Sequence, residues 1–384
     1  MEKDLVVLSV FGTRPEAIKM APLVLALEKT EHIRSLVCIT AQHREMLDSV
    51  MEQFDIHADY DLNLMRCGQT LTSITTGILQ GMDHVLQECK PDIVLVHGDT
   101  TTSTSAALAA FYHQIPVGHV EAGLRSFNPY SPFPEEMNRQ LTSRMAMLHF
   151  APSELSRLNL AHEGITQGVF VVGNTVIDAL KMMVHDGYRF RCEALHSIDL
   201  HSGRTIVMTA HRRENLGKPL ENICHAALRL VEHYPDLQLI YPVHPNPAVR
   251  STVNSVLADH PRIHLIEPLE VEDMHNLIQH STLVMTDSGG LQEEAPAMGK
   301  PILVLRSETE RPEVVEAGIA LLTGIEEQTI FNAACRVLDD PKLYEKMSHA
   351  ANPYGNGHTS EKIVGILQQV FQNDKASLLT GVMV

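Results

Sequence analysis

The sequence predicts two doubly wound α/β domains. Short apolar runs alternate with longer amphipathic segments, which is the pattern of strand–helix–strand units in a parallel sheet. The runs are apolar at consecutive positions, so we expect strands buried on both faces. The alternation starts again after a polar connection from 189 to 203. We place the domain change near residue 174, giving domains 1–173 and 174–360, and expect the C-terminal helix segment 361–384 to pack back on the first domain.

The composition is that of a soluble globular protein. The 384 residues are 44% hydrophobic and 20% charged, and the length suits two or three domains. A formal charge of -17 argues against a general nucleic-acid or anionic-membrane surface. It still permits a local basic pocket for a small anionic ligand.

Neither a disulfide framework nor a zinc site is indicated, because the six cysteines are scattered without a CxxC pair. The N-terminus has no basic and apolar leader, and no apolar run approaches the ~18 residues of a membrane span. We therefore expect a cytoplasmic protein that does not insert into a membrane.

The first strand, Leu5 to Val10, leads into FGTRPEAIKM, and Thr13 and Pro15 mark the start of a helix. Ligands of open parallel sheets collect along the carboxyl ends of the strands. Arg14 and Lys19 flank this helix start, where two cations suit a diphosphate. The alternative is an ordinary solvated first turn.

Two carboxylates follow consecutive strands. Asp99 comes after the strand 91–97, and Glu121 comes after the strand 115–120. A right-handed parallel unit brings both to one edge of the sheet. Close carboxylates raise each other's proton affinity, which suits acid–base work. The alternative is a helix cap at Asp99 and a salt bridge at Glu121.

A proline-rich loop then delivers Glu135 and Glu136 to a helix start. Adjacent helical residues point about 100° apart, so one of the two faces a given pocket. We select Glu135. The stretch from 59 to 70 is expected to be irregular.

The second half brings cations and a glycine turn to its strand ends. His211 and Arg212 follow the strand 205–209, and His244 follows the strand 237–242. A lone histidine is more often structural than catalytic, but histidine and arginine together at a strand end are harder to dismiss. The turn at TDSGGLQEEAP exposes backbone N–H groups at a helix start, which attracts phosphate. An ordinary helix N-terminus is the alternative.

Eight motifs together resemble the bacterial non-hydrolysing UDP-N-acetylglucosamine 2-epimerases over nearly the full length: FGTRPEAIKM, TAQHREML, HGDTTT, HVEAGLR, HRREN, DSGGLQEEAP, GKP and ERPE. That family has the glycosyltransferase-B architecture, two Rossmann-like domains facing across a cleft. The resemblance implies interconversion of UDP-N-acetylglucosamine and UDP-N-acetylmannosamine for cell-surface polysaccharide synthesis. It implies a homodimer and neither a metal nor a nicotinamide cofactor.

The resemblance also implies roles for residues in three groups. The first is catalytic: Asp99, Glu121, Glu135 and His211. The second holds UDP, with Glu294 on the ribose and Met274 where relatives commonly carry a phenylalanine near the uracil: Arg14, Lys19, Ser288, Gly289, Gly290, Glu294, Arg311 and Met274. The third binds UDP-N-acetylglucosamine as an allosteric activator: Gln42, Gln69, Arg212 and His244, together with Glu135. Glu45 and Gly68 depart from the glutamine and arginine of some members, which leaves the strength of activation open.

Other function classes use the same nucleotide sugar. A glycosyltransferase of the same architecture needs an acceptor groove, a hydrolysing epimerase releases UDP, and a sensor binds without turnover. The sequence carries no GxGxxG, GxxxxGK[ST] or HExxH motif, so dinucleotide, P-loop and zinc-protease chemistry lack their main signals.

Overall fold

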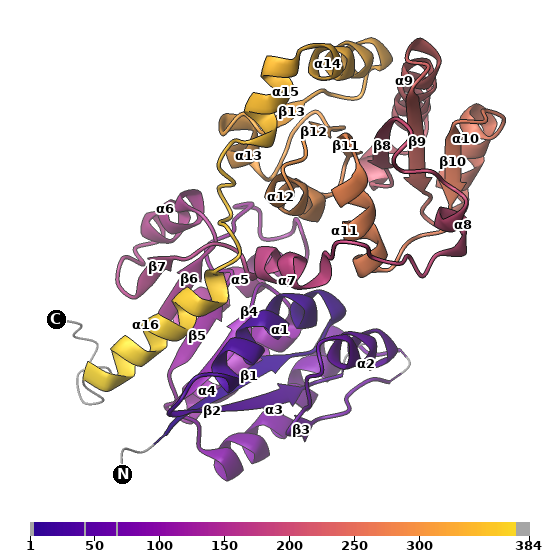
Figure 1. Cartoon of the computed structure of the whole chain (residues 1–384). Helices are drawn as coiled ribbons and strands as arrows, with labels where there is room; N and C mark the ends of the chain where they lie inside the picture. The colour runs from indigo at the N-terminus through magenta and orange to yellow at the C-terminus, as the bar shows by residue number, and fades with distance from the viewer. Residues whose placement is uncertain (1–3, 42–43, 67, 374–384) are drawn as a thin grey trace. The chain divides into compact units, whose positions relative to one another are not determined.

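The computed structural model describes residues 4–41, 44–66 and 68–373. The chain forms two compact units (Figure 1). Unit 1 runs from the N-terminus to Ala179 and resumes at Tyr354, and unit 2 is Leu180–Pro353. Each unit contains one parallel sheet flanked by helices, so the predicted fold class is confirmed.

The sheet of unit 1 has the order β3-β2-β1-β4-β5-β6-β7, in which β1 and β4 are neighbours and the chain winds outward in both directions. All of its pairings are parallel. Its strands are β1 (Leu5–Phe11), β2 (Ile33–Ile39), β3 (Tyr60–Asp61), β4 (Ile93–His97), β5 (Val117–Val120), β6 (Leu148–Ala151) and β7 (Val169–Val171).

Helices cover this sheet in two groups. α1 packs beside α2 and α16, whereas α4 packs between α3 and α5. The helices are α1 (Arg14–Glu28), α2 (Arg44–Gln53), α3 (Leu71–Cys89), α4 (Thr101–Tyr112), α5 (Glu135–Met145), α6 (Glu154–His162), α7 (Thr175–Met183) and α16 (Thr359–Asn373).

Unit 2 repeats the plan with the strand order β10-β9-β8-β11-β12-β13. Its strands are β8 (Arg204–Thr209), β9 (Leu237–Pro242), β10 (Ile263–Ile266), β11 (Leu283–Thr286), β12 (Ile302–Val304) and β13 (Ala320–Leu322). Its helices are α8 (Glu193–His196), a 3-10 turn η1 (Arg213–Asn215), α9 (Lys218–His233), α10 (Pro247–Leu257), α11 (Val271–His280), α12 (Gly289–Ala297), α13 (Pro312–Glu316), α14 (Glu327–Asp339) and α15 (Pro341–Ser348).

The strands are apolar at consecutive positions because each faces helices on both sides. In β1, Leu8 and Val10 join the buried cluster formed with α3 and α4. Val7 and Ser9 alternate with them and are also buried, at 0% exposure. Side chains of a strand point alternately to its two faces, so this pattern requires helices on both faces of the sheet.

The stretch expected to be irregular and the polar connection each contain a short element. The segment 59–70 includes β3, which pairs with β2 through Cys38 and Ile39. The segment 189–203 includes the single-turn helix α8. Both are too short to show a hydrophobic period. None of the helices in the described residues has the length and apolar character needed to cross a membrane.

Candidate functional site

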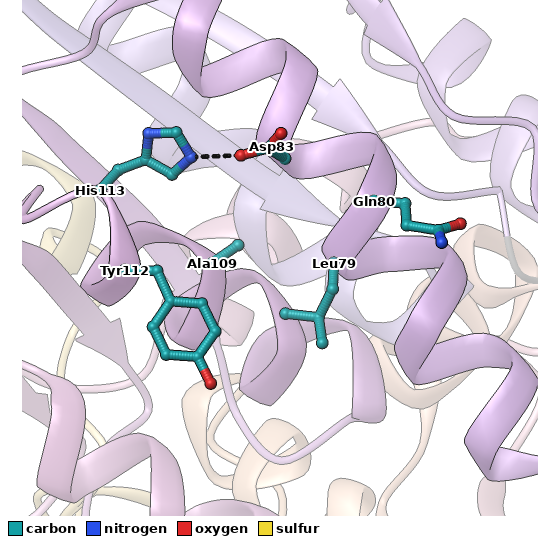
Figure 2. Close-up of a pocket in the computed structure, with 6 residues that line it drawn as sticks. All are labelled: Leu79, Gln80, Asp83, Ala109, Tyr112 and His113. Carbon is teal, nitrogen blue, oxygen red and sulfur yellow. Dashed lines mark hydrogen bonds and ion pairs between the residues drawn. The ribbon is translucent and has the colours of Figure 1, made fainter.

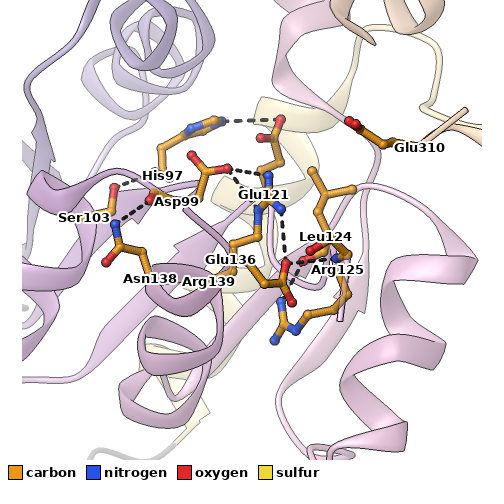
Figure 3. Close-up of polar contacts among 12 residues, drawn as sticks. His97, Asp99, Ser103, Glu121, Leu124, Arg125, Glu136, Asn138, Arg139 and Glu310 are labelled. Carbon is orange, nitrogen blue, oxygen red and sulfur yellow. Dashed lines mark hydrogen bonds and ion pairs between the residues drawn. The ribbon is translucent and has the colours of Figure 1, made fainter. Parts of the chain in front are cut away.

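The carboxyl ends of β4 and β5 bring the first two predicted carboxylates to one edge. β4 pairs with β5 in parallel, and His97 lies opposite Val120 in the register. Asp99 and Glu121 follow these neighbouring strands directly. The sequence-based inference about a shared sheet edge is therefore confirmed (Figure 3).

Glu121 is buried and held by several side chains. Its residue exposure is 9%, and its Oε2 pairs with the Lys19 ammonium. The same oxygen accepts a hydrogen bond from Asn174 Nδ2 at 2.8 Å and lies 3.8 Å from His97 Nε2. Its backbone φ is +63°, in the left-handed region, which is energetically unfavourable for a residue that has a Cβ atom. The fold thus places this carboxylate at a strained backbone position, as functional sites often do.

The protonation states of Glu121 and His97 follow from this packing. Burial raises the pKa of Glu121. The positive charges of Lys19 and, at low pH, of protonated His97 outweigh burial together with the hydrogen bonds from Lys19 and Asn174, so the pKa lies well below its usual range. Burial lowers the pKa of His97 to about 4, against the opposing charge of Glu121. Near neutral pH, Glu121 is therefore a carboxylate beside a neutral imidazole.

Two residues of α5 donate hydrogen bonds to Asp99. Arg139 donates to its Oδ2 through Nε at 2.9 Å and Nη2 at 2.6 Å, and Asn138 donates to its backbone carbonyl at 2.9 Å (Figure 3). Arg139 also reaches Glu136 Oε2 at 3.3 Å. Asp99 is therefore oriented by an arginine that the sequence analysis did not single out.

The two adjacent glutamates of α5 differ sharply. Glu136 is fully buried and accepts hydrogen bonds from the backbone N–H groups of Ser126 at 2.9 Å and Phe127 at 3.2 Å. Burial raises the pKa of Glu136, but the hydrogen bonds from the Ser126 N–H and Gln140, together with the charge and hydrogen bond of Arg139, outweigh burial and lower it. Glu135 is only half-buried. Glu136 thus anchors the preceding loop, while Glu135 remains accessible.

A further carboxylate, Glu16, joins two turns at the same edge. It is 2% exposed and accepts hydrogen bonds from the N–H groups of Gly12 at 3.0 Å and Thr13 at 2.8 Å, after β1. Its other oxygen accepts from Thr100 Oγ1 at 2.5 Å, at the start of α4. The sequence analysis missed this role, although Thr13-x-x-Glu16 is a capping-box pattern. Arg14 is the first residue of α1 and is half-buried.

In unit 2, α12 begins directly after the Ser-Gly-Gly turn. Ser288 is the N-cap with an extended backbone, and its side chain makes no capping hydrogen bond. Gly289 and Gly290 are the first two helical residues. The positive end of a helix dipole and the backbone N–H groups of a helix start attract phosphate, so this turn is a candidate phosphate site.

The other residues expected to hold UDP lie on three elements of unit 2. Glu294 Oε2 lies 2.9 Å from His275 Nε2 of α11, and half-buried Met274 precedes that histidine. Arg311, at the start of α13, donates from Nε to Glu293 Oε1 at 2.5 Å. The two glutamates therefore have different partners inside the unit.

Asp287, which the sequence analysis did not select, fixes the loop that carries His211. It is fully buried at the end of β11, and its Oδ2 accepts from the N–H groups of His211 and Arg212, each at 2.8 Å. β11 and β8 are parallel neighbours, so Asp287 and the loop after β8 lie at the same edge of the sheet. The rings of His211 and His244 stack with centroids 5.1 Å apart. Burial lowers the pKa of His211, although Asp287 opposes this shift.

Of the residues implied for an activator, Gln69 lies in unit 1, and Arg212 and His244 lie in unit 2. Gln69 accepts from the N–H of Arg66 at 3.1 Å and donates to the Leu64 carbonyl at 2.5 Å. Arg212 approaches Glu310 at 3.4 Å through Nη1. Gln42 lies outside the described residues.

Comparison with known proteins decides the family. The profile of the family described as UDP-N-acetylglucosamine 2-epimerase matches residues 25–368. The chain belongs to the UDP-N-acetylglucosamine 2-epimerase family. This is a family of isomerases. The expected resemblance is therefore confirmed.

Relatives of the epimerase family match along nearly the whole chain. The UDP-N-acetylglucosamine 2-epimerase of Bacillus subtilis is 54% identical over 365 residues, 94% of this chain and 94% of its own. A solved S. aureus protein in complex with UDP is 50% identical with a TM-score of 0.84, covering 96% of this chain and 97% of that one. The UDP-GlcNAc 2-epimerase from Neisseria meningitidis, bound to UDP-GlcNAc, is 49% identical with a TM-score of 0.82, covering 95% and 100%.

A separate hollow of about 280 Å³ lies between α3 and α4 (Figure 2). Ala109, Tyr112 and His113 line it at the C-terminal end of α4. That helix starts at the carboxyl end of β4, so the hollow lies at the opposite edge of the sheet from Asp99 and Glu121. We assign no epimerase role to it. In the described part of the chain, no group of three or more His, Cys, Asp or Glu side chains is arranged to hold a metal ion.

Proposed function

We propose that this chain interconverts UDP-N-acetylglucosamine and UDP-N-acetylmannosamine without net hydrolysis, by eliminating UDP and adding it back. The observation that carries the proposal is the pair of carboxylates, Asp99 and Glu121, at the ends of neighbouring strands. The chain's membership of a family named for this epimerisation supports the choice of substrate.

The chemistry requires the leaving group to depart first. The hydrogen at C2 of the sugar is not acidic, because no carbonyl group adjoins it. When the bond between C1 and the phosphate oxygen breaks, the oxocarbenium-like centre at C1 acidifies C2. A carboxylate then takes the C2 proton, and a glycal forms together with UDP. Readdition of UDP at C1, with a proton delivered to the opposite face of C2, gives the epimer.

Inversion at C2 calls for acid–base groups on two faces of the sugar. We propose that Asp99, Glu121 and Glu135 share this work with His211. Glu121 is ionised near neutral pH, as a proton acceptor must be. The half-buried position of Glu135 supports a role in contacting substrate, whereas buried Glu136 is occupied by backbone N–H groups.

The departing diphosphate needs positive charge and hydrogen-bond donors. We assign this role to Arg14 and Lys19 of α1, to the start of α12 and to Arg311. Glu294 would hold the ribose hydroxyls and Met274 would lie near the uracil. At the start of α12, the residues proposed to bind the diphosphate are Ser288, Gly289 and Gly290. Lys19 already pairs with Glu121, so we infer that it links the diphosphate to the proton-transfer group.

We further propose that UDP-N-acetylglucosamine activates the protein at a second site formed by Gln42, Gln69, Arg212 and His244. A ligand that binds one conformation better than another shifts the population toward it. From the family resemblance we also propose a cytoplasmic homodimer that supplies cell-surface polysaccharide synthesis. Light scattering at micromolar concentration tests the dimer, and a monomer would contradict it.

The direct test of the reaction is an NMR spectrum of UDP-N-acetylglucosamine incubated with the purified protein. We expect signals of UDP-N-acetylmannosamine to appear until the two sugar nucleotides reach a constant ratio. Accumulation of free UDP and N-acetylmannosamine would instead indicate a hydrolysing epimerase. An unchanged spectrum would contradict the proposal.

A further inference from the structure

Asn174 lies at the point where α7 begins, in a tightly packed turn. It is 2% exposed and follows Gly173, whose φ is +103°. A Cβ at Gly173 would lie 2.7 Å from Thr359 Oγ1 and 2.9 Å from the Tyr354 carbonyl oxygen, so only glycine fits there. The backbone N–H of Asn174 donates to that same Tyr354 carbonyl at 2.8 Å. The main chain at Asn174 is therefore fixed against the segment by which the chain returns to unit 1.

The side-chain amide of Asn174 has a determined orientation. Its Oδ1 accepts the N–H of Val176 at 3.1 Å, in the first turn of α7. Its Nδ2 donates to Glu121 Oε2 at 2.8 Å. An amide flip would place the oxygen against the Glu121 carboxylate and the nitrogen against a backbone donor. The amide therefore presents a fixed donor to Glu121.

The surroundings of Glu121 explain why this donor matters. The titratable side chains that meet Glu121 are Lys19 from α1 and His97 at the end of β4, and Asp99 acts on His97 in turn. Lys19 has a long flexible side chain and is proposed to meet the diphosphate as well. Because His97 is neutral near pH 7, it supplies no positive charge. Asn174 is a short, buried and fully oriented partner whose contact does not depend on a bound ligand.

We propose that Asn174 is a positioning residue that orients the Glu121 carboxylate for proton transfer at C2. Asn174 acts through Glu121 and does not itself contact the sugar nucleotide. Its role in turnover rests on the proposed epimerase function. Its contact with Glu121 does not.

Two substitutions separate the cap of α7 from the donor to Glu121. Asn174→Ser keeps an oxygen that caps the helix but removes the Nδ2 donor. Asn174→Asp keeps the size and the capping oxygen but places a second carboxylate against Glu121. Ser153→Ala is the matched control, because Ser153 is a 2% exposed N-cap of α6 in the same unit, accepting from the Ser156 N–H.

The deciding measurement is the carbon-13 chemical shift of the Glu121 side-chain carboxylate near neutral pH, by NMR of full-length protein with labelled glutamate. The resonance is assigned by its disappearance in Glu121→Gln. Loss of the hydrogen bond from Nδ2 should move this resonance in Asn174→Ser. Asn174→Asp should move it as well, because a carboxylate replaces the donor. Ser153→Ala should leave it at the wild-type value.

The kinetic readout is the separation of kcat from KM. Asn174→Ser should lower kcat about tenfold or more, the factor that corresponds to one such hydrogen bond, and leave KM nearly unchanged. A Glu121 resonance at the same position in wild type, Asn174→Ser and Asn174→Asp would overturn the proposal, and so would an unaltered kcat in both variants of an active enzyme. If the wild-type protein has no epimerase activity, the proposed function fails, and the chemical shift alone still decides whether Asn174 orients Glu121.

Discussion

The Asp287 carboxylate accepts a hydrogen bond from the backbone N–H of His211 at 2.8 Å. It also accepts from the N–H of Arg212 and, at 3.0 Å, from Asn215 Nδ2. One fully buried carboxylate at the end of β11 thus shapes the loop after β8. The position of His211 therefore depends on Asp287, a residue for which we propose no catalytic role.

Asp287→Ala should destabilise unit 2 by about 3 kcal/mol or more, because it leaves several buried donors without an acceptor. Asp287→Asn should cost less, since its amide oxygen still accepts hydrogen bonds. Urea denaturation followed by circular dichroism measures both. Asp259→Ala is the control, because Asp259 is exposed in the same unit. Equal stability of Asp287→Ala and this control would refute the anchoring role.

The carboxylates of unit 1 should separate into chemical and structural groups. We expect Asp99→Asn, Glu121→Gln and Glu135→Gln each to lower turnover about 100-fold or more while the fold persists. Glu154→Gln, an exposed carboxylate paired with Arg157, should leave turnover unchanged. Near-normal rates in all three variants would remove the carboxylate mechanism.

The adjacent pair in α5 gives a sharper contrast. Glu136→Gln should lower the free energy of unfolding by about 2 kcal/mol, because an amide group would face a backbone N–H that now meets a carboxylate oxygen. Glu135→Gln should leave stability unchanged and lower kcat. Thermal unfolding and kinetics of the two variants decide this, and the reverse pattern would show that the wrong glutamate was selected.

The sequence predicts the two sheets and the strand ends that carry the site, but not the partners of the site residues. Alternating apolar and amphipathic segments predicted both parallel sheets, and strand ends predicted that Asp99 and Glu121 share an edge. The partners of these residues, Arg139 and Asn174, come from distant elements, α5 and the turn before α7. Such contacts depend on tertiary packing and leave no local pattern. The sequence marks Asp287 only by its place after a strand, where a carboxylate can equally bind a ligand or anchor a loop.

Stability of unit 1 should fall as the pH drops below about 6.5. Burial lowers the pKa of His97 to about 4, of His119 to about 3 and of His149 to about 4. Each histidine is neutral in the folded protein but takes up a proton when the protein unfolds. Its contribution to stability is therefore complete above the pKa of the unfolded state and is lost as the pH falls toward the pKa of the folded state. His149→Gln should reduce the slope by up to about 1.4 kcal/mol per pH unit. The exposed His32→Gln should not, and equal slopes would contradict the buried neutral state.

Activation should appear as a lag. Rigorously purified UDP-N-acetylmannosamine is expected to react slowly until a small amount of UDP-N-acetylglucosamine forms or is added, because the activator favours the active conformation. Gln69→Ala should lengthen the lag, whereas Gln87→Ala, on the outer surface of α3, should not. Lag-free hyperbolic kinetics from the purified substrate would exclude the activator site.

The central claim is elimination and readdition of UDP, and isotopes test it most directly. UDP-N-acetylglucosamine carrying oxygen-18 in the bridge between C1 and phosphorus is incubated with the protein in deuterium oxide, and the products are followed by NMR. Elimination breaks the C2–H and C1–O bonds, so we predict deuterium at C2 and movement of the oxygen-18 into non-bridging positions as the freed diphosphate rotates. A direct proton exchange would introduce deuterium but keep the label in the bridge. Inversion at C2 with the original hydrogen retained would contradict the account.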